Sequence, residues 1–218
     1  MSKLSYMTLR EKAADEIRMK ILTQEYPPGM KIVEQNLSNE FEISRGPIRE
    51  ALRQLEQEGL LEYSRNIGCS VKDVTIEDVY EIYLLRSTYE VLAVRSFQGK
   101  FTEKELAQME DILNKMQDSG TTDIRQIIDH DHMLHQIIVE KSGMPRLIKS
   151  WKELDYGSSI AVRYGRPDRK EMNEHQYNIH HDLIQIFRMG YTEDICQAIS
   201  DHYMLPVKKI MAEQGKKR

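Results

Sequence analysis

The sequence is poor in cysteine and contains no long apolar run. Only Cys69 and Cys196 occur among 218 residues, so neither a disulfide framework nor a cysteine-based metal motif is expected, and both should be packing residues. The N-terminus lacks the basic segment and apolar run of a signal peptide, and no stretch approaches the roughly 18 apolar residues that span a bilayer. These absences predict a cytoplasmic protein.

A basic excess is also missing. The formal net charge is −4, and residues 1–73 contain 11 basic and 12 acidic side chains. Proteins that bind nucleic acids are often basic overall. Any affinity of this chain for DNA must therefore come from where its basic side chains are placed.

What is present is the composition of a folded protein. Hydrophobic residues make up 40% of the chain and charged residues 30%, which is too apolar for a disordered chain. The length allows one large domain or two small ones. The pattern changes near residue 73, so we expect a winged helix-turn-helix over 1–73 and an all-helical domain over 74–218, without a flexible linker between them.

The first helices are predicted from apolar spacing. Apolar residues recur at every fourth position over 8–23, which is typical of an amphipathic helix, and the following Pro27-Pro28-Gly29 must end it. A short helix is expected over 33–40. Another begins at Ser44, whose side chain can cap its first turn, and ends at Gly59.

The segment 60–72 predicts two short strands around a turn that contains Asn66 and Gly68. On the helix before it, Arg45, Arg49 and Arg53 recur every four residues and share one face, opposite an apolar stripe. This arrangement suits a recognition helix that docks by its apolar face and reads DNA with its arginines. Alone it also fits a solvated surface, but the order of helices, turn and hairpin favours DNA binding.

The second half is helical in period and contains all seven histidines. We expect about six helices in an antiparallel bundle, over 75–98, 102–118, 122–142, 144–164, 168–189 and 192–213. Asp131 and His135 share an apolar face, and His180 and His202 each lie on the apolar face of another helix. Any one histidine alone is better explained as a hydrogen-bonded core residue. A divalent cation would compensate the whole set of buried polar groups.

The N-terminal half resembles the GntR family of regulators. The matching residues are Pro28-Gly29, Leu37-Ser38, the run Ser44-Arg45-Gly46-Pro47-Ile48-Arg49-Glu50-Ala51-Leu52, Leu55 and Glu58-Gly59-Leu60. The resemblance implies that Arg45 and Arg49 contact a double-stranded DNA operator and that Arg53 supports this binding by contacting a DNA phosphate. It also implies that Gly68 lies at the wing tip. Ser44, which opens the same helix, belongs to this expected DNA-contacting set.

The C-terminal half resembles the FCD domain of the FadR-type branch of that family. The resemblance implies an antiparallel helical bundle in which Asp131, His135, His180 and His202 bind a metal ion. Zinc suits this donor set, and nickel, manganese or iron also fit. Arg86 matches a family arginine that anchors the carboxylate of a small organic-acid effector, or else it is a surface arginine paired with Glu90. The segment Ile179-His180-His181 departs from the family pattern and leaves His181 as an alternative ligand.

These features predict a homodimeric transcription regulator, a repressor, whose effector shifts its affinity for a near-palindromic operator. Two alternatives remain open. A metal-dependent hydrolase could use the same ligands to activate water, although the sequence has no His-Glu-x-x-His motif, Gly-rich phosphate loop or Gly-x-Ser-x-Gly, and residues 8–73 would be unexplained. A regulator could also sense the metal itself. We expect no catalytic residues.

Overall fold

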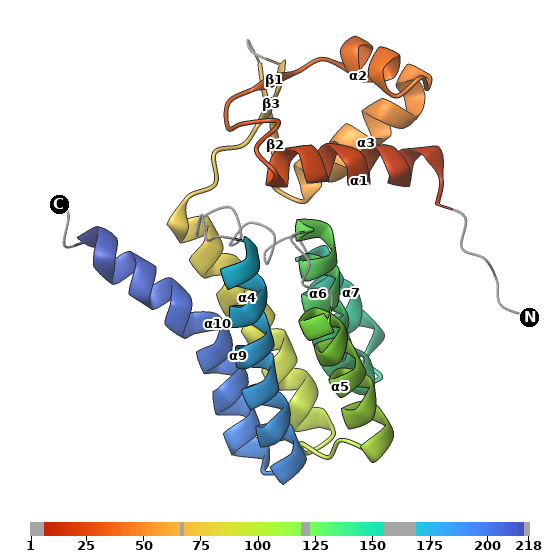
Figure 1. Cartoon of the computed structure of the whole chain (residues 1–218). Coiled ribbons are helices and arrows are strands. Elements are labelled where there is room, and N and C mark those ends of the chain that lie inside the picture. The colour runs from red at the N-terminus through yellow and green to blue at the C-terminus, as the bar shows by residue number, and fades with distance from the viewer. Residues whose placement is uncertain (1–6, 66–67, 119–122, 155–168, 216–218) are drawn as a thin grey trace, which may run out of the picture. The chain divides into compact units, whose positions relative to one another are not determined.

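The computed structural model describes residues 7–65, 68–118, 123–154 and 169–215. The chain divides into two compact units, Met1–Val74 and Thr75–Arg218, which we call the N-terminal and C-terminal units. Figure 1 shows a small sheet in the N-terminal unit, whereas the described elements of the C-terminal unit are all helices. None of the described helices is both long and apolar enough to cross a membrane.

Three helices form the core of the N-terminal unit. Helix α1 (Leu9–Leu22) begins with a capping box between Thr8 and Glu11 and packs against α3 (Arg45–Gln57). Helix α2 (Glu34–Glu40) packs against α3 as well. The apolar stripe of α3 is fully buried; its members are Ile48, Ala51, Leu52 and Leu55. Burial of this stripe leaves the arginine face of α3 toward solvent.

A three-stranded antiparallel sheet completes this unit and confirms the predicted winged helix-turn-helix. The strands β1 (Lys31–Ile32), β2 (Leu61–Ser64) and β3 (Gly68–Val71) lie in the order β1-β3-β2, and Cys69 of β3 is opposite both Ile32 and Tyr63. Strand β1 was not predicted, because two residues are too few to show an alternating pattern. Of the predicted turn, Asn66 lies outside the described residues.

The described part of the C-terminal unit is a bundle of six helices. They are α4 (Ile76–Ser96), α5 (Glu103–Asp118), α6 (Ile124–Lys141), α7 (Pro145–Glu153), α9 (Arg169–Met189) and α10 (Thr192–Gly215). Helix α4 packs against α6, α7 and α10, and α9 packs against α5, α6 and α10. The apolar core between them confirms the mainly helical bundle that the 3.6-residue period predicts.

One predicted span is wrong at its C-terminal end. The sequence predicts a helix over 144–164, but α7 ends at Glu153, and Leu154 has left the helical conformation. The buried residues of α7 are Leu147 and Trp151. The helix therefore loses its tertiary support soon after Trp151, before the sequence reaches a strong helix breaker. The rest of the predicted span, 155–164, lies outside the described residues.

Helix α10 contains a proline in its interior. Pro206 has no backbone N–H and cannot donate to the carbonyl of His202, four positions earlier. Figure 1 shows that α10 changes direction along its length. His202 thus lies one turn before an interruption of the hydrogen-bond ladder.

The turn between α4 and α5 depends on Gly99. Its φ of 66° lies in the left-handed region. A Cβ at this position would be 3.1 Å from the Cα of Thr192 and 3.1 Å from the Cδ1 of Ile195. Glycine therefore allows the end of α4 to touch the first turn of α10, and this contact helps set the spacing of the two helices that contain Glu90 and His202.

We expect Gly99→Ala to lower the free energy of unfolding by roughly 2–4 kcal/mol, because backbone strain and a collision with α10 add together. Gly143→Ala is the matched control. Gly143 has a φ of 63°, and nothing lies within 4 Å of its ideal Cβ, so only the backbone strain should be lost, about 1 kcal/mol. Urea denaturation of both variants measures the difference. Equal losses would contradict a tight α4–α10 contact.

Candidate functional site

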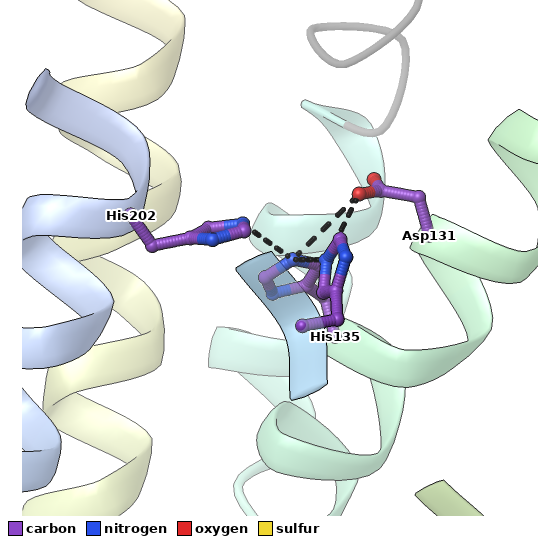
Figure 2. A group of neighbouring side chains, drawn as sticks. Asp131, His135 and His202 are labelled. Atoms are coloured by element: carbon purple, nitrogen blue, oxygen red, sulfur yellow. Dashed lines mark hydrogen bonds and ion pairs between the residues drawn. The ribbon is translucent and has the colours of Figure 1, made fainter. Parts of the chain in front are cut away.

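Four side chains from three helices of the C-terminal unit converge in the bundle. Asp131 and His135 come from α6, His180 from α9 and His202 from α10, and one donor atom of each lies within 4.8 Å of the others. Figure 2 shows Asp131, His135 and His202 pointing toward a common centre. The fold therefore brings together all four residues that the sequence singled out as metal ligands.

The spacing of the donor atoms fits a small divalent cation. The Nε2 atom of His135 lies 3.2 Å from Nε2 of His180 and 3.1 Å from Nε2 of His202. Oδ1 of Asp131 lies 3.2 Å from Nε2 of His180 and 3.9 Å from Nε2 of His135. Ligands bound tetrahedrally at about 2.0–2.1 Å from one ion are roughly 3.3 Å apart.

Hydrogen-bond acceptors on the side away from the common centre set the tautomers of two imidazoles. The Nδ1 atom of His135 lies 2.8 Å from a carboxylate oxygen of Glu90, and Nδ1 of His180 lies 2.7 Å from the carbonyl oxygen of Gln176. Both oxygens are acceptors, so each Nδ1 carries the donated hydrogen. In the neutral rings, the lone pairs are therefore at Nε2, which faces the common centre.

Facing lone pairs cannot hydrogen bond to each other. The Nε2 atoms of His135 and His180, at 3.2 Å, repel unless a positive charge lies between them. Burial and the neighbouring imidazoles lower the pKa of His202 well below its usual range, which keeps that ring neutral. Burial alone would raise the pKa of Asp131, but positive charge at His180 and His135 holds it far below its usual range, and a metal ion bound between the neutral rings would supply such a charge. This donor set suits a divalent metal ion.

A buried carboxylate, Glu90, links the ligand set to the rest of the bundle. It accepts hydrogen bonds from His135 of α6, from Nε1 of Trp151 in α7 at 2.9 Å and from the hydroxyl of Tyr203 in α10 at 2.6 Å. Burial, opposed by the charge of Arg86, raises the pKa of Tyr203 well above its usual range, so this hydroxyl remains a donor. Glu90 thus connects three neighbouring helices to α4.

Arg86 lies one turn before Glu90 and is 0% exposed, so the alternative of a surface arginine is wrong. Its Nε donates to the hydroxyl of Tyr203 at 3.2 Å, and its guanidinium lies 4.5 Å from the centre of the Trp151 ring. Burial lowers the pKa of Arg86, but Tyr203 and the carboxylates of Glu90 and Asp131 raise it above its usual range. A fixed positive charge therefore lies in the same buried region as Asp131.

The other histidines on α6 and α9 do not join the ligand set. His181 is exposed and its Nδ1 lies 3.4 Å from Asp182, so the structure places His180, and not His181, among the four converging donors. His132 stacks on Trp151 with ring centroids 5.0 Å apart. The helix face on which each histidine lies therefore decides whether it joins the four converging donors.

The arginines expected to contact DNA lie together on the N-terminal unit. The side chains of Arg45 and Arg49 are 55% and 50% exposed, and both pair with Glu34 of α2. Arg53 is also exposed on α3. Ser44 occupies the N-cap position, but its side chain makes no capping hydrogen bond, contrary to the prediction.

Gly68, the glycine expected near the wing tip, is exposed and opens β3 with a φ of 86°. A shallow surface groove reaches from Gly68 and Tyr63 to Glu34 and the arginines Arg45 and Arg49. The described end of the hairpin and the arginine face of α3 therefore border one continuous surface of the N-terminal unit.

Sequence reasoning missed the roles of Glu90 and Glu34. Arg86 and Glu90 are four residues apart, a spacing that surface ion pairs share. A usable signal follows Glu90, because the buried Ala93 and Val94 continue the same helix face. Glu34 carries no comparable signal, because its arginine partners lie on the next helix.

Two family comparisons cover most of the chain. Residues 9–71 match the family described as "Bacterial regulatory proteins, gntR family", and residues 81–204 match the FCD domain. The second match covers more than half of the chain.

Individual relatives agree with these matches. The uncharacterized HTH-type transcriptional regulator YdhC of Bacillus subtilis (strain 168) is 35% identical over 131 residues, which are 59% of this chain and 58% of that protein. The gluconate operon transcriptional repressor of Bacillus licheniformis is 28% identical over 152 residues, 69% of this chain and 62% of that protein. In both cases the chain spans less than two thirds of the relative's length.

The fold also matches a solved structure. E. coli McbR/YncC superposes with a TM-score of 0.75 at 22% identity, over 96% of this chain and 99% of that chain. At this identity the likeness concerns the fold alone. Because the matched families and relatives are transcription regulators and not enzymes, the alternative of a metal-dependent hydrolase is set aside.

We expect Glu90→Gln to weaken zinc binding by about 10–100-fold. The amide cannot accept from His135, Trp151 and Tyr203 together. If its oxygen serves Trp151 and Tyr203, its NH2 faces His135 and favours the tautomer with hydrogen on Nε2. Glu193→Gln, an exposed change on α10, should leave the affinity unchanged. Competition with a chromophoric zinc chelator measures both variants, and equal affinities would contradict this role of Glu90.

Proposed function

Because the chain belongs to the GntR family of bacterial regulatory proteins and carries an FCD domain, we propose that it is a DNA-binding transcription regulator. Its proposed action is repression, relieved or strengthened by a small carboxylate that binds beside a divalent metal ion in the C-terminal unit. The similarity to a gluconate operon repressor supports this class of action, and gluconate is itself a small carboxylate.

The observation that carries the DNA-binding proposal is the exposed arginine face of α3. Arg45 and Arg49 project from the first turns of a helix whose opposite face is buried against α1 and α2. A helix held in this way can enter the major groove, where arginine side chains pair with guanine edges or phosphates. Placement thus compensates for the missing basic excess.

The metal part of the proposal rests on the converging donors. Asp131, His135, His180 and His202 would hold the ion, and zinc is the metal that this donor set suits best. When bound, the ion supplies a positive charge that an anionic oxygen can bind. The residues behind the site set the tautomers, so the chain itself prepares the donors.

The effector part of the proposal rests on Arg86. A buried guanidinium that is held by Tyr203 and stacked on Trp151 is a preorganised partner for a carboxylate. The ring of Tyr203 lies 5.2 Å from the rings of His135 and His202, so Arg86, which donates to Tyr203, adjoins the candidate metal ligands. A small organic acid would satisfy both positive charges, with hydrogen bonds to Arg86 and an oxygen toward the metal.

We also propose that the regulator acts as a homodimer on a near-palindromic operator. The outer face of α4 exposes Leu84, Leu85 and Leu92, which are 43%, 37% and 51% accessible in the single chain. A second copy could cover this apolar strip symmetrically. Effector binding would then favour one arrangement of the dimer and change operator affinity by its differential binding energy.

The DNA proposal is tested with Arg49→Ala. DNA duplexes selected by the wild-type protein from a random pool serve as probes, and their affinity should fall about tenfold or more because one guanidinium contact is lost. Arg95→Ala is matched in exposure and in its pairing with a glutamate, but lies on α4. It should leave DNA affinity unchanged. Fluorescence anisotropy measures both, and equal effects would argue against reading by α3.

The effector proposal is tested with zinc-loaded protein and a panel of small carboxylates that includes gluconate, with sorbitol as an uncharged partner. A carboxylate that binds should raise the free energy of unfolding by about 2.7 kcal/mol at 100 times its Kd, which is measured as a higher melting temperature. It should also change DNA affinity. Arg86→Lys should weaken this binding about tenfold while zinc affinity is retained. A response of DNA affinity to zinc alone would identify the metal as the signal instead.

A further inference from the structure

One carboxylate of the N-terminal unit holds both arginines that are expected to read DNA. Oε1 of Glu34 lies 3.1 Å from Nε of Arg49, and its Oε2 lies 3.1 Å from Nη2 of the same residue. Oε2 also lies 3.1 Å from Nη2 of Arg45. Glu34 belongs to the first turn of α2, so the contact joins the two helices of the helix-turn-helix.

The geometry of the pair with Arg49 leaves a defined edge for another partner. Glu34 uses the side of the guanidinium that contains Nε and Nη2. The adjacent edge, formed by Nη1 and the second hydrogen of Nη2, lies at the end of the side chain and can still donate two parallel hydrogen bonds. That edge is the one that a guanine or a phosphate would meet.

The charges also matter. Hydrogen bonding to Arg49 and Arg45 outweighs partial burial and holds the pKa of Glu34 below its usual range, so the group is a carboxylate at neutral pH. One negative charge therefore faces two positive charges at this surface. It reduces the attraction to any phosphate, whatever the sequence of the DNA.

We propose that Glu34 is a specificity-determining residue of the DNA-binding surface, which positions Arg45 and Arg49 for base reading and lowers affinity for non-specific DNA. The inference rests on the proposed DNA-binding function. An unpaired exposed arginine samples many rotamers and reaches whichever phosphate is nearest. Two arginines held at one carboxylate keep a fixed spacing. They form favourable hydrogen bonds only with a DNA sequence whose acceptors have the same spacing.

A purely structural role makes a different prediction. A glutamate in the first turn of α2 also stabilises the helix dipole, and this effect would change the melting temperature without changing sequence preference. The discriminating quantity is therefore the ratio of the Kd for a scrambled duplex to the Kd for a selected duplex of equal length and composition.

The experiment uses the full chain and duplexes that the wild-type protein selects from a random pool. In Glu34→Gln, we expect affinity for the scrambled duplex to rise about fivefold, the effect of one unit charge at 4 Å in water. The specificity ratio should fall about tenfold. The dependence of affinity on salt should steepen by about one unit of logarithmic slope, because one more phosphate contact forms.

Two further variants separate position from charge. Glu34→Asp keeps the charge but withdraws it by one methylene, so the specificity ratio should fall while affinity for the scrambled duplex stays near the wild-type value. Glu50→Gln removes a charge from an exposed position on α3 and should leave the ratio unchanged. Melting curves check that all variants are folded.

The outcomes distinguish the inference from its premise. An unchanged ratio in both Glu34 variants, or an equal fall in Glu50→Gln, overturns the role of Glu34 and leaves DNA binding intact. A wild-type protein that selects no sequence from the pool overturns both.

Discussion

The C-terminal unit depends on the hydrogen bonds of one buried acidic side chain. Glu90 has no exposed surface, and three helices direct a hydrogen-bond donor at it. A buried charge is tolerated only where such donors compensate it. The same bonds fix the ring of His135 and hold Tyr203, which in turn holds Arg86. The same hydrogen bonds therefore join the helices of the bundle and orient the candidate metal ligands.

The sequence predicts the fold well because both units express their period clearly. Apolar spacing of four locates the stripe of α3, and glycine and proline mark most helix ends. It fails where tertiary contacts decide. Strand β1 exists only because β3 lies beside it, and α7 stops where its packing residues stop, at Trp151. Neither contact leaves a local pattern in the chain.

The candidate site divides along the same line. The four candidate metal ligands are predictable, because each of these polar side chains lies on an otherwise apolar helix face. The residues that support them are harder to predict. Gln176 accepts through its backbone carbonyl, which every residue type has, so its side chain gives no signal in the sequence. Glu34 meets its arginines across a turn, 11 and 15 residues along the chain. Such pairs require the crossing of two helices, which spacing within one helix does not specify.

The proline of α10 gives the ligand set a mechanical consequence. Pro206 removes the backbone bond to the carbonyl of His202, so the helix is least stiff just beyond that ligand. A metal ion bound by His202 would therefore hold α10 at the turn where its backbone hydrogen-bond ladder is interrupted.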